Sequence, residues 1–512
     1  MQPDPSRSTS SALVLTAGVA TAAVGLGLAL GWEPGIPGEW VWRRNSLPFH
    51  AWLPFAIGLA LTALAAALCR SGAWERTSRS RRILAFAALI CVVFAFQVAL
   101  LNAVGIPWVA PGVYIISPSV TTYYGVSLDV RSLPDWLMRY PELLPTLPYH
   151  AATHPPGLVT CFWLVRKLAA ILPLPQSAVL DDLVGLGDTL GLSLTRSDAL
   201  AAILSALLIS LIGALGLIPI YLLARALTNA GAAIRAACLV GAMPGLVLLG
   251  ASPDLIVMTL CAGALFRGYA GYRGSRLCAV IAGLVAAVGL FLSLAFALVV
   301  VWALLWAVVG IARSSDRGNA LRAVARAAAF SIAGFAVFYL ALYLLFGYRP
   351  IAVAVQALAA HRGVTEIETA RTYWKWVLMN PVECALFAGL PLAIGALWSV
   401  PSLGAGFACP EPGRRGRSAN GNAGFTSHAP HNSELASFLI AWITLFALLD
   451  LSGMVRGEVG RIWLFLLWPL AVAAGAALSR RADSGRATAL LVFMQVCQAL
   501  MMKGYLTIYS IL

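Results

Sequence analysis

Long apolar runs recur along the whole chain, and they limit what it can fold into more than any other feature. The hydrocarbon core of a bilayer is about 30 Å thick, and a helix needs roughly 20 apolar residues to cross it. Such runs follow one another from residue 11 to residue 512, separated by polar segments. With 60% hydrophobic and 11% charged residues, the composition excludes a soluble globular domain. The sequence predicts an all-α, polytopic membrane protein.

About thirteen of these runs are long enough to count as membrane crossings. They are residues 12–31, 49–69, 83–104, 201–224, 234–250, 253–266, 277–291, 294–312, 327–347, 381–400, 435–451, 462–478 and 487–512. The length of the first run favours a retained helix over a cleaved signal peptide. We expect residues 1–82 to form an N-terminal transmembrane hairpin and residues 83–512 to form the main transmembrane domain.

Basic residues are distributed unevenly between the loops, which predicts an orientation. With the N-terminus in the cytoplasm, 21 of the 35 Lys and Arg residues fall on the cytoplasmic side, as expected for short loops. The net charge of +14 therefore reflects topology, and no nucleic-acid partner is expected. Arg outnumbers Lys and Ala is abundant, which indicates a GC-rich bacterial genome. We expect a multi-pass protein of the bacterial inner (plasma) membrane.

Residues 105–197 form a long extracytoplasmic loop in this orientation. Its segment 157–172 is apolar enough to be a crossing, but it carries Arg166 and Lys167. A crossing there would move every later Arg cluster to the outside, so we interpret the segment as a juxtamembrane or re-entrant helix. A second outer segment, residues 348–380, mixes apolar, charged and aromatic residues and predicts an interfacial cover.

Residues 401–434 predict a flexible cytoplasmic loop, because they are rich in Gly, Ser, Asn and Arg. His428 and His431 in this loop could ligate a metal, although the composition favours a solvated linker. The nine cysteines show no CxxC pair and no spacing suited to zinc. They are interpreted as small buried hydrophobic residues.

The stretch YHAATHPPGLV, residues 149–159, places two histidines ahead of a proline pair and an apolar helix. A residue before proline adopts extended geometry, and proline is well tolerated in the first turn of a helix, so HPPG predicts a helix start. His154, beside His150, would then lie near free backbone N–H groups that favour an anion such as phosphate. The alternative is a rigid turn in which His154 hydrogen-bonds to the backbone.

Three segments in this order resemble membrane glycosyltransferases of the C-type (GT-C) fold. The HPP element is similar to the one that closes the first large outer loop of that family. Residues 197–258, which contain YLLARALTNAGAAIRAACLVGAMPGLVLLGASPDL, and residues 456–470, RGEVGRIWLFLLWPL, resemble two later family patterns. Protein O-mannosyltransferases and aminoarabinose transferases, of the glycosyltransferase family 39 kind, are members. The resemblance covers most of residues 83–480.

The resemblance implies the transfer of a sugar from a polyprenyl-phosphate or polyprenyl-diphosphate donor at the extracytoplasmic face, by an inverting displacement. Such chemistry needs cations for the departing phosphate. Arg456 and Arg461 bracket Glu458 in a loop of about eight residues between two apolar runs, too short to leave the membrane surface. Guanidinium groups suit forked phosphate contacts. The alternative for Arg456 and Arg461 is anchoring to lipid head groups.

The chemistry also needs a carboxylate that takes a proton from the acceptor hydroxyl. Members of the family carry an acidic residue soon after the helix that precedes the long outer loop, but residues 110–126 of this chain contain none. Asp129, Asp135 and Glu142 follow later and could be moved into place. Asp129 and Asp135 have arginines nearby, which also fits ordinary surface pairs.

Two further carboxylates lie outside that loop. Glu39 sits beside Trp40 and Trp42 at a Pro/Gly turn, and it projects into the site if the first hairpin packs against the long outer loop. Otherwise this turn is an aromatic belt at the water boundary. Asp254, in GASPDL, lies at a tight outer turn, where a carboxylate suggests a functional site or a helix cap. The candidate base therefore stays open among Glu39, Asp129, Asp254 and Glu458.

The missing acid leaves a second class of function open, namely a non-catalytic lipid-binding, transport or assembly protein on the same scaffold. A carrier would need charged or broken helices near the bilayer midplane and internal repeats. Charges inside the apolar runs are nearly absent, which favours an enzyme. The sugar, the acceptor (glycan, lipid or protein) and the assistance of a divalent metal ion are left undetermined by the sequence.

Overall fold

The apolar runs form helices that span the length of the molecule in a computed structural model, which describes residues 5–70, 72–398, 429–481 and 483–509. The helices of this bundle are α1 (Pro5–Ala29), α2 (Trp52–Leu68), α4 (Arg79–Leu101), α11 (Arg196–Leu215), α12 (Leu217–Leu227), α13 (Ala230–Gly241), α14 (Pro244–Leu248), α15 (Asp254–Tyr272), α16 (Arg276–Leu292), η2 (Leu294–Phe296), α17 (Ala297–Arg313), α18 (Arg317–Phe346), α20 (Tyr373–Ala388), α21 (Leu390–Leu397), α23 (Ala429–Ser452), η3 (Leu464–Leu466), α25 (Pro469–Leu478) and α26 (Ser484–Tyr505).

Shorter elements connect these helices. They are β1 (Gly35–Ile36), β2 (Trp40–Val41), α3 (Ala73–Arg76), α5 (Val109–Ile116), α6 (Tyr123–Asp129), α7 (Leu133–Leu143), η1 (Leu144–Thr146), α8 (Tyr149–Ala152), α9 (Gly157–Ala169), α10 (Ala178–Thr189), α19 (Pro350–Thr369) and α24 (Val459–Ile462). Strands β1 and β2 pair antiparallel in the loop between α1 and α2. The protein is thus all-α apart from one two-residue hairpin in the described part of the chain.

The expected membrane crossings coincide with helices. Within the described residues, eight helices are long and apolar enough to cross a membrane, and the pair α20 and α21, bent by 108°, provides a ninth. Four shorter apolar segments coincide with the remaining runs: Trp52–Leu68, Ala230–Gly241, Arg276–Leu292 and Leu464–Leu478. The prediction of an all-α polytopic membrane protein is confirmed.

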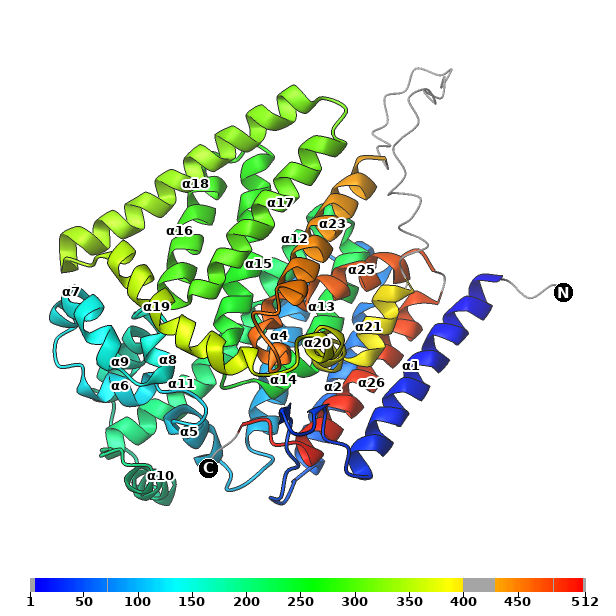
Figure 1. Ribbon diagram of the computed structural model, residues 1–512. Helices are drawn as coiled ribbons and strands as arrows, with labels where there is room; N and C mark the ends of the chain where they lie inside the picture. Colours follow the sequence, from blue (N-terminus) through cyan, green and yellow to red (C-terminus); the bar gives the residue numbers. More distant parts are fainter. Residues whose placement is uncertain (1–4, 71, 399–428, 482, 510–512) are drawn as a thin grey trace.

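Most of the connecting elements lie at one end of the bundle, which we call the outer end. Helices α5 to α10 form a group there, and the β1–β2 loop also lies at this end (Figure 1). Helix α9 lies within this group and is not among the helices that could span a membrane, as expected from its basic residues. Arg166 of α9 instead donates to Asp198 at the start of α11, with Nε and Oδ1 2.8 Å apart. Most of the 401–434 loop, including His428, lies outside the described residues, as does the side chain of His431.

Glycines allow close contact between α16 and α18 and between α16 and α9. A Cβ atom at Gly283 of α16 would lie 1.8 Å from the carbonyl oxygen of Ser331, and one at Gly334 of α18 would lie 2.1 Å from that of Val280. In lipid the hydrophobic effect does not drive helices together, so close van der Waals contact of this kind holds them in place. Gly157, the first residue of α9, fits in the same way against the carbonyl oxygen of Phe291 at the end of α16. The HPPG segment is therefore a helix start fixed against the bundle.

Candidate active site

A charged cluster forms around Arg461 at the outer end of the bundle. The one-turn helix α24 begins after Gly457 (φ +100°) and Glu458 (φ +58°), so two successive left-handed residues turn the chain sharply there. Nη2 of Arg461 then lies 2.8 Å from Oε2 of Glu458, and Nε of Arg461 lies 3.9 Å from Oδ2 of Asp254. Their side chains are 24% (Arg461), 33% (Glu458) and 35% (Asp254) exposed, so the ion pairs remain reachable from outside.

Asp254 opens helix α15 and is held toward Arg461 by its own turn. The hydroxyl of Ser252 donates to Oδ2 of Asp254 over 2.6 Å. Ser252 is buried, whereas Asp254 is half-buried. One carboxylate oxygen of Asp254 thus bonds to Ser252, and the same carboxylate faces the guanidinium of Arg461.

Aromatic and histidine side chains surround this ion-pair group. Arg461 interacts electrostatically with Tyr123 and Tyr509 as well as with both carboxylates. The positive charge of Arg461 also lowers the pKa of His150. We call this group the Arg461 cluster: Tyr123, His150, Asp254, Glu458, Arg461 and Tyr509. Five separate segments of the chain contribute to it, so it exists only in the folded protein.

His150, the histidine of the Arg461 cluster, has a ring nitrogen that a ligand could contact. Its Nδ1 atom is buried and hydrogen-bonds to no residue that the structure describes. Burial lowers the pKa of His150 to about 4, and the positive charge of Arg461 lowers it further in the same direction. The ring is therefore neutral at pH 7, and it can either accept or donate a hydrogen bond to a bound molecule.

His154 is more fully occupied by the protein itself. Its Nδ1 atom lies 3.0 Å from the carbonyl oxygen of His150 and 3.0 Å from Oγ1 of Thr153. Its ring packs against the rings of Tyr123 and His361. The pKa of His154 is lowered to about 3, chiefly by burial and to a smaller extent by the charges of His361, His150 and Arg461. These contacts are those of the rigid-turn alternative, although His154 still lies within electrostatic reach of Arg461.

Glu39 lies at the N-terminus of α20, among donors that saturate it. It accepts hydrogen bonds from the Thr372 backbone (2.9 Å), the Thr372 hydroxyl (2.6 Å) and Nε1 of Trp376 (2.8 Å), and it pairs with Lys375 at 3.3 Å. The hydroxyl of Thr372 is the largest cause that lowers the pKa of Glu39 to about 2. A carboxylate so stabilised is a weak proton acceptor. Its turn packs through Trp40 on Trp376 of α20.

The acidic residues of the long outer loop lie on the surface. Asp129 is exposed at the end of α6. Asp135 forms an exposed pair with Arg139 at 3.7 Å, and Glu142 pairs with Arg349. Of these three, none has a described contact with Arg461.

Arg456 holds the loop that leads to α24. Its Nη1 donates to the carbonyl oxygen of Arg371, and Arg371 donates to the carbonyl oxygen of Arg456. Nε of Arg456 donates to Gly453 over 3.0 Å, and the guanidinium lies 5.5 Å from the ring centroid of Tyr373. Arg456 and Arg461 thus differ, because Arg456 ties two backbone segments together whereas Arg461 pairs with acidic side chains.

Two buried charged residues lie near the cluster that the sequence did not assign to the site, although Glu383 stood out as a charge near the end of an apolar run. Lys503 is 3% exposed, with Nζ 3.4 Å from the hydroxyl of Tyr114, whose ring lies 4.5 Å from that of Tyr509. Glu383 accepts from the backbone of Gly460 (3.0 Å) and so holds α24 one residue before Arg461. A charge inside an apolar run is a functional signal by default, and that signal was present at both positions.

The described residues contain no group of three or more His, Cys, Asp and Glu side chains that could hold a metal ion. The Arg461 cluster instead offers one guanidinium, two carboxylates, two phenol hydroxyls and a neutral imidazole. The guanidinium, the phenol hydroxyls and the imidazole can donate hydrogen bonds to an anionic ligand such as a phosphate, and a carboxylate can accept a proton.

Fold and site together define an all-α polytopic membrane protein with an accessible charged cluster at one end of its helices. No family model matches the chain, and no curated protein matches it. Among solved structures, the crystal structure of the Archaeoglobus fulgidus oligosaccharyltransferase, in complex with Zn and sulfate, is similar over 81% of this chain. The sequence identity is 16% and the TM-score is 0.42. This chain spans about half of that one, 53% of its length.

Proposed function

We propose that the protein is a membrane glycosyltransferase that moves a sugar from a polyprenyl-phosphate-linked donor to an acceptor at the outer end of the bundle. The observation that carries this proposal is Arg461 held between Asp254 and Glu458, partly exposed, beside an imidazole with a free ring nitrogen. The guanidinium and the imidazole can stabilise the departing phosphate, and a carboxylate can take the proton of the attacking hydroxyl. From the distribution of Lys and Arg, we assign the outer end to the periplasm or cell exterior.

Arg461 binds the donor phosphate in this proposal. Without donor, the two carboxylates keep the guanidinium in place and balance its charge. The donor phosphate is a diester with one negative charge and free acceptor oxygens, and it can replace one carboxylate as the partner of the guanidinium. The free Nδ1 of His150, in the tautomer that carries the proton there, then donates a second hydrogen bond to a phosphate oxygen. Anchoring to lipid head groups, the alternative for Arg461, would not require the two acidic partners.

Asp254 serves as the general base. It removes the proton from the acceptor hydroxyl while the hydroxyl oxygen attacks the anomeric carbon from the face opposite the phosphate. The bond between that carbon and the phosphate oxygen breaks, its electron pair stays on the phosphate, and Arg461 neutralises the charge that develops there. Attack from the opposite face inverts the anomeric configuration. The Ser252 hydroxyl keeps the carboxylate oriented during proton transfer.

Asp254 is preferred over the other candidate bases for geometric reasons. Glu39 is saturated by donors of α20, and Asp129 is exposed on the surface of α6. Glu458 lies closer to Arg461 than Asp254 does, at 2.8 Å against 3.9 Å, and is the stronger partner of the guanidinium. Asp254 therefore has the carboxylate that is more readily released for proton transfer.

The test is a transfer assay with the full chain in nanodiscs and a set of radiolabelled polyprenyl-phosphate sugars. Wild type is expected to release labelled product with at least one donor, and Asp254→Asn is expected to lose most of that transfer while retaining donor binding. Asp135→Asn, which removes an exposed carboxylate at the same end, is the matched control and should transfer normally. Equal transfer by Asp254→Asn and wild type would refute the assignment of the base. Donor binding without transfer to any acceptor would favour the non-catalytic alternative.

A further inference from the structure

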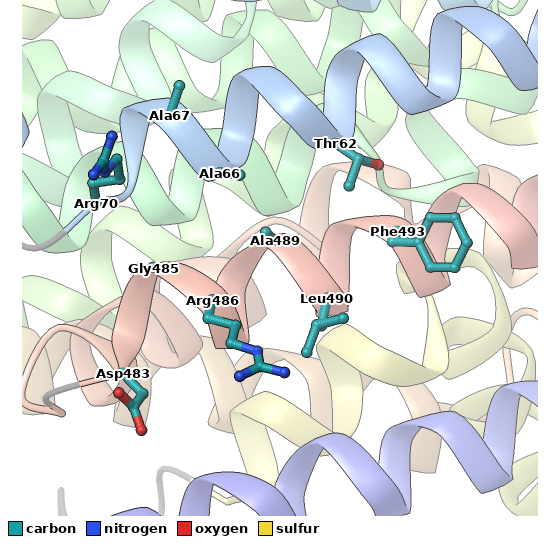
Figure 2. A pocket seen from close by; sticks show the side chains of 10 residues that line it. All are labelled: Thr62, Ala66, Ala67, Arg70, Asp483, Gly485, Arg486, Ala489, Leu490 and Phe493. Atoms are coloured by element: carbon teal, nitrogen blue, oxygen red, sulfur yellow. The ribbon is translucent and has the colours of Figure 1, made fainter.

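A groove lies between α2 and α26, away from the Arg461 cluster. Its volume is about 690 Å³, which falls within the range of roughly 300–1,000 Å³ typical of small-molecule sites. Residues of two elements line it: Thr62, Ala66, Ala67 and Arg70 from α2 and its end, and Asp483, Gly485, Arg486, Ala489, Leu490 and Phe493 from α26 and its start. Figure 2 shows these side chains along the two helices.

The groove has a charged end and an apolar end. Arg70, Asp483 and Arg486 lie at one end, whereas Thr62 and Phe493 lie toward the other (Figure 2). Between the two ends the groove is lined by the short side chains of Ala66 and Ala489 and by Leu490. The apolar part therefore suits a hydrocarbon chain rather than a polar molecule.

The charged end is built on a close contact between backbones. A Cβ atom at Gly485 would lie 2.6 Å from the carbonyl oxygen of Cys69 and 3.2 Å from Cα of Arg70. Arg235, only 5% exposed, joins the same two segments by donating to the carbonyl oxygen of Cys69 (3.1 Å) and to the hydroxyl of Ser484 (2.6 Å). The end of α2 and the first turn of α26 are thus fixed beside each other.

The cations at this end are available for a ligand. Arg70 and Arg486 are both exposed, and neither forms an ion pair with any residue in the described part of the chain. Asp483 is exposed too, so two arginines and one aspartate leave a net charge of +1 at this end of the groove. Exposed arginine side chains can rotate toward a phosphate at small cost, and guanidinium groups bind phosphate oxygens in forked geometry.

We propose that this groove binds one anionic glycerophospholipid, with an acyl chain along Ala66, Ala489 and Phe493 and the phosphate at Arg70 and Arg486. The charged end belongs to the cytoplasmic side in the orientation given by the Lys and Arg distribution, and basic pockets between transmembrane helices on that side bind anionic head groups. The excess of positive charge at the entrance selects an anionic lipid over a zwitterionic one. The bound lipid links α2 to α26, the helix that ends at Lys503 and Tyr505 near the Arg461 cluster.

The experiment is native mass spectrometry of the full chain released from nanodiscs of phosphatidylcholine with a fraction of phosphatidylglycerol. One phosphatidylglycerol is expected to stay bound to wild type in preference to phosphatidylcholine. The double variant Arg70→Ala/Arg486→Ala should lower phosphatidylglycerol affinity about ten-fold or more, since two charge-assisted contacts are lost. Ala489→Phe, which fills the groove and keeps both arginines, should also lose the lipid.

Arg79→Ala/Arg81→Ala is the matched control, because it removes two exposed arginines at the start of α4 and changes the net charge equally. It should retain wild-type binding within about two-fold, as expected for surface charges that make no direct contact. Equal binding by the groove variants and wild type would refute the proposal, as would an equal loss in the control. A free-phosphate arm, with glycerol phosphate in place of lipid, should show no competition; full displacement by glycerol phosphate would refute the acyl-chain part. Circular dichroism confirms that each variant is folded.

Discussion

Replacement of Arg461 by alanine distinguishes a catalytic role from a structural one, because the two roles predict different losses of transfer rate and of unfolding free energy. The pairs of Arg461 with Glu458 and Asp254 are 24–35% exposed, so solvent screens them and their loss should cost about 1 kcal/mol in the free energy of unfolding. The loss of a group that stabilises charge in the transition state costs about 2.7–4 kcal/mol, or roughly 10²–10³ in kcat. We therefore expect transfer to fall by two to three orders of magnitude in a protein that remains folded.

Arg461→Lys refines this prediction. Lysine keeps the positive charge but loses the planar fork that binds two oxygens at once, so transfer should lie between that of wild type and Arg461→Ala. Arg139→Ala, which breaks an exposed pair with Asp135 at the same end, is the control for a general change in surface charge. It should leave both transfer and thermal stability unchanged.

The measurement combines single-turnover transfer of a radiolabelled sugar from its polyprenyl phosphate with thermal unfolding of each variant. A loss of transfer below about three-fold for Arg461→Ala would refute the reasoning, because it falls far short of the roughly 10²–10³ typical of a group that stabilises transition-state charge. A loss of stability much larger than about 1 kcal/mol, with transfer reduced in proportion to the unfolded fraction, would make Arg461 a structural residue.

Three further predictions concern the scaffold around the cluster. Glu39→Ala should lower the free energy of unfolding by about 2 kcal/mol in denaturant titration, since hydrogen bonds to a charged group are lost. Because the pKa of Glu39 is lowered to about 2, wild type should lose this stability only as the pH falls from about 4.5 toward 2. A pH-independent difference between the two proteins would contradict the assignment. The pKa of His150 is lowered from 6.5 to about 4, so between these values the unfolded chain binds a proton that the folded chain does not; thermal scans should show stability falling as the pH drops from 6.5 to 4, with a smaller slope in His150→Gln. Gly157→Ala should destabilise by about 1–3 kcal/mol because its Cβ would meet the carbonyl oxygen of Phe291, whereas Gly185→Ala, which has open space around it, should be tolerated; equal thermal midpoints would refute the packing argument.

The crossings and the helix start were predictable because each depends on residues near one another in the sequence. A run of about 20 apolar residues has to become a helix in lipid, since every backbone polar group must be satisfied within the segment. The proline pair at 155–156 forces the helix to begin near Gly157, where α9 does begin. Arg166 and Lys167 argued against a crossing at residues 157–172; α9 has 13 residues, and its Arg166 pairs with Asp198.

The composition of the charged cluster was only partly predictable. Asp254 and Arg461 were both candidates, but 207 residues separate them, and no local pattern states that α15 and α24 begin side by side. Local patterns also failed to distinguish Arg456 from Arg461, which differ because one guanidinium binds backbone carbonyls and the other binds carboxylates. Glu39 was an open alternative for the same reason, since its partners on α20 lie more than 330 residues away.

Direct observation of the donor tests the central claim, that Arg461, His150 and Asp254 form one donor-binding site. The measurement is a structure of the full chain in lipid with a polyprenyl-phosphate donor. We predict that the phosphate oxygens lie within about 3 Å of the Arg461 guanidinium and of Nδ1 of His150, with the anomeric carbon facing Asp254. A phosphate bound instead at Arg456, or at any place that Arg461 and His150 cannot reach, would contradict it.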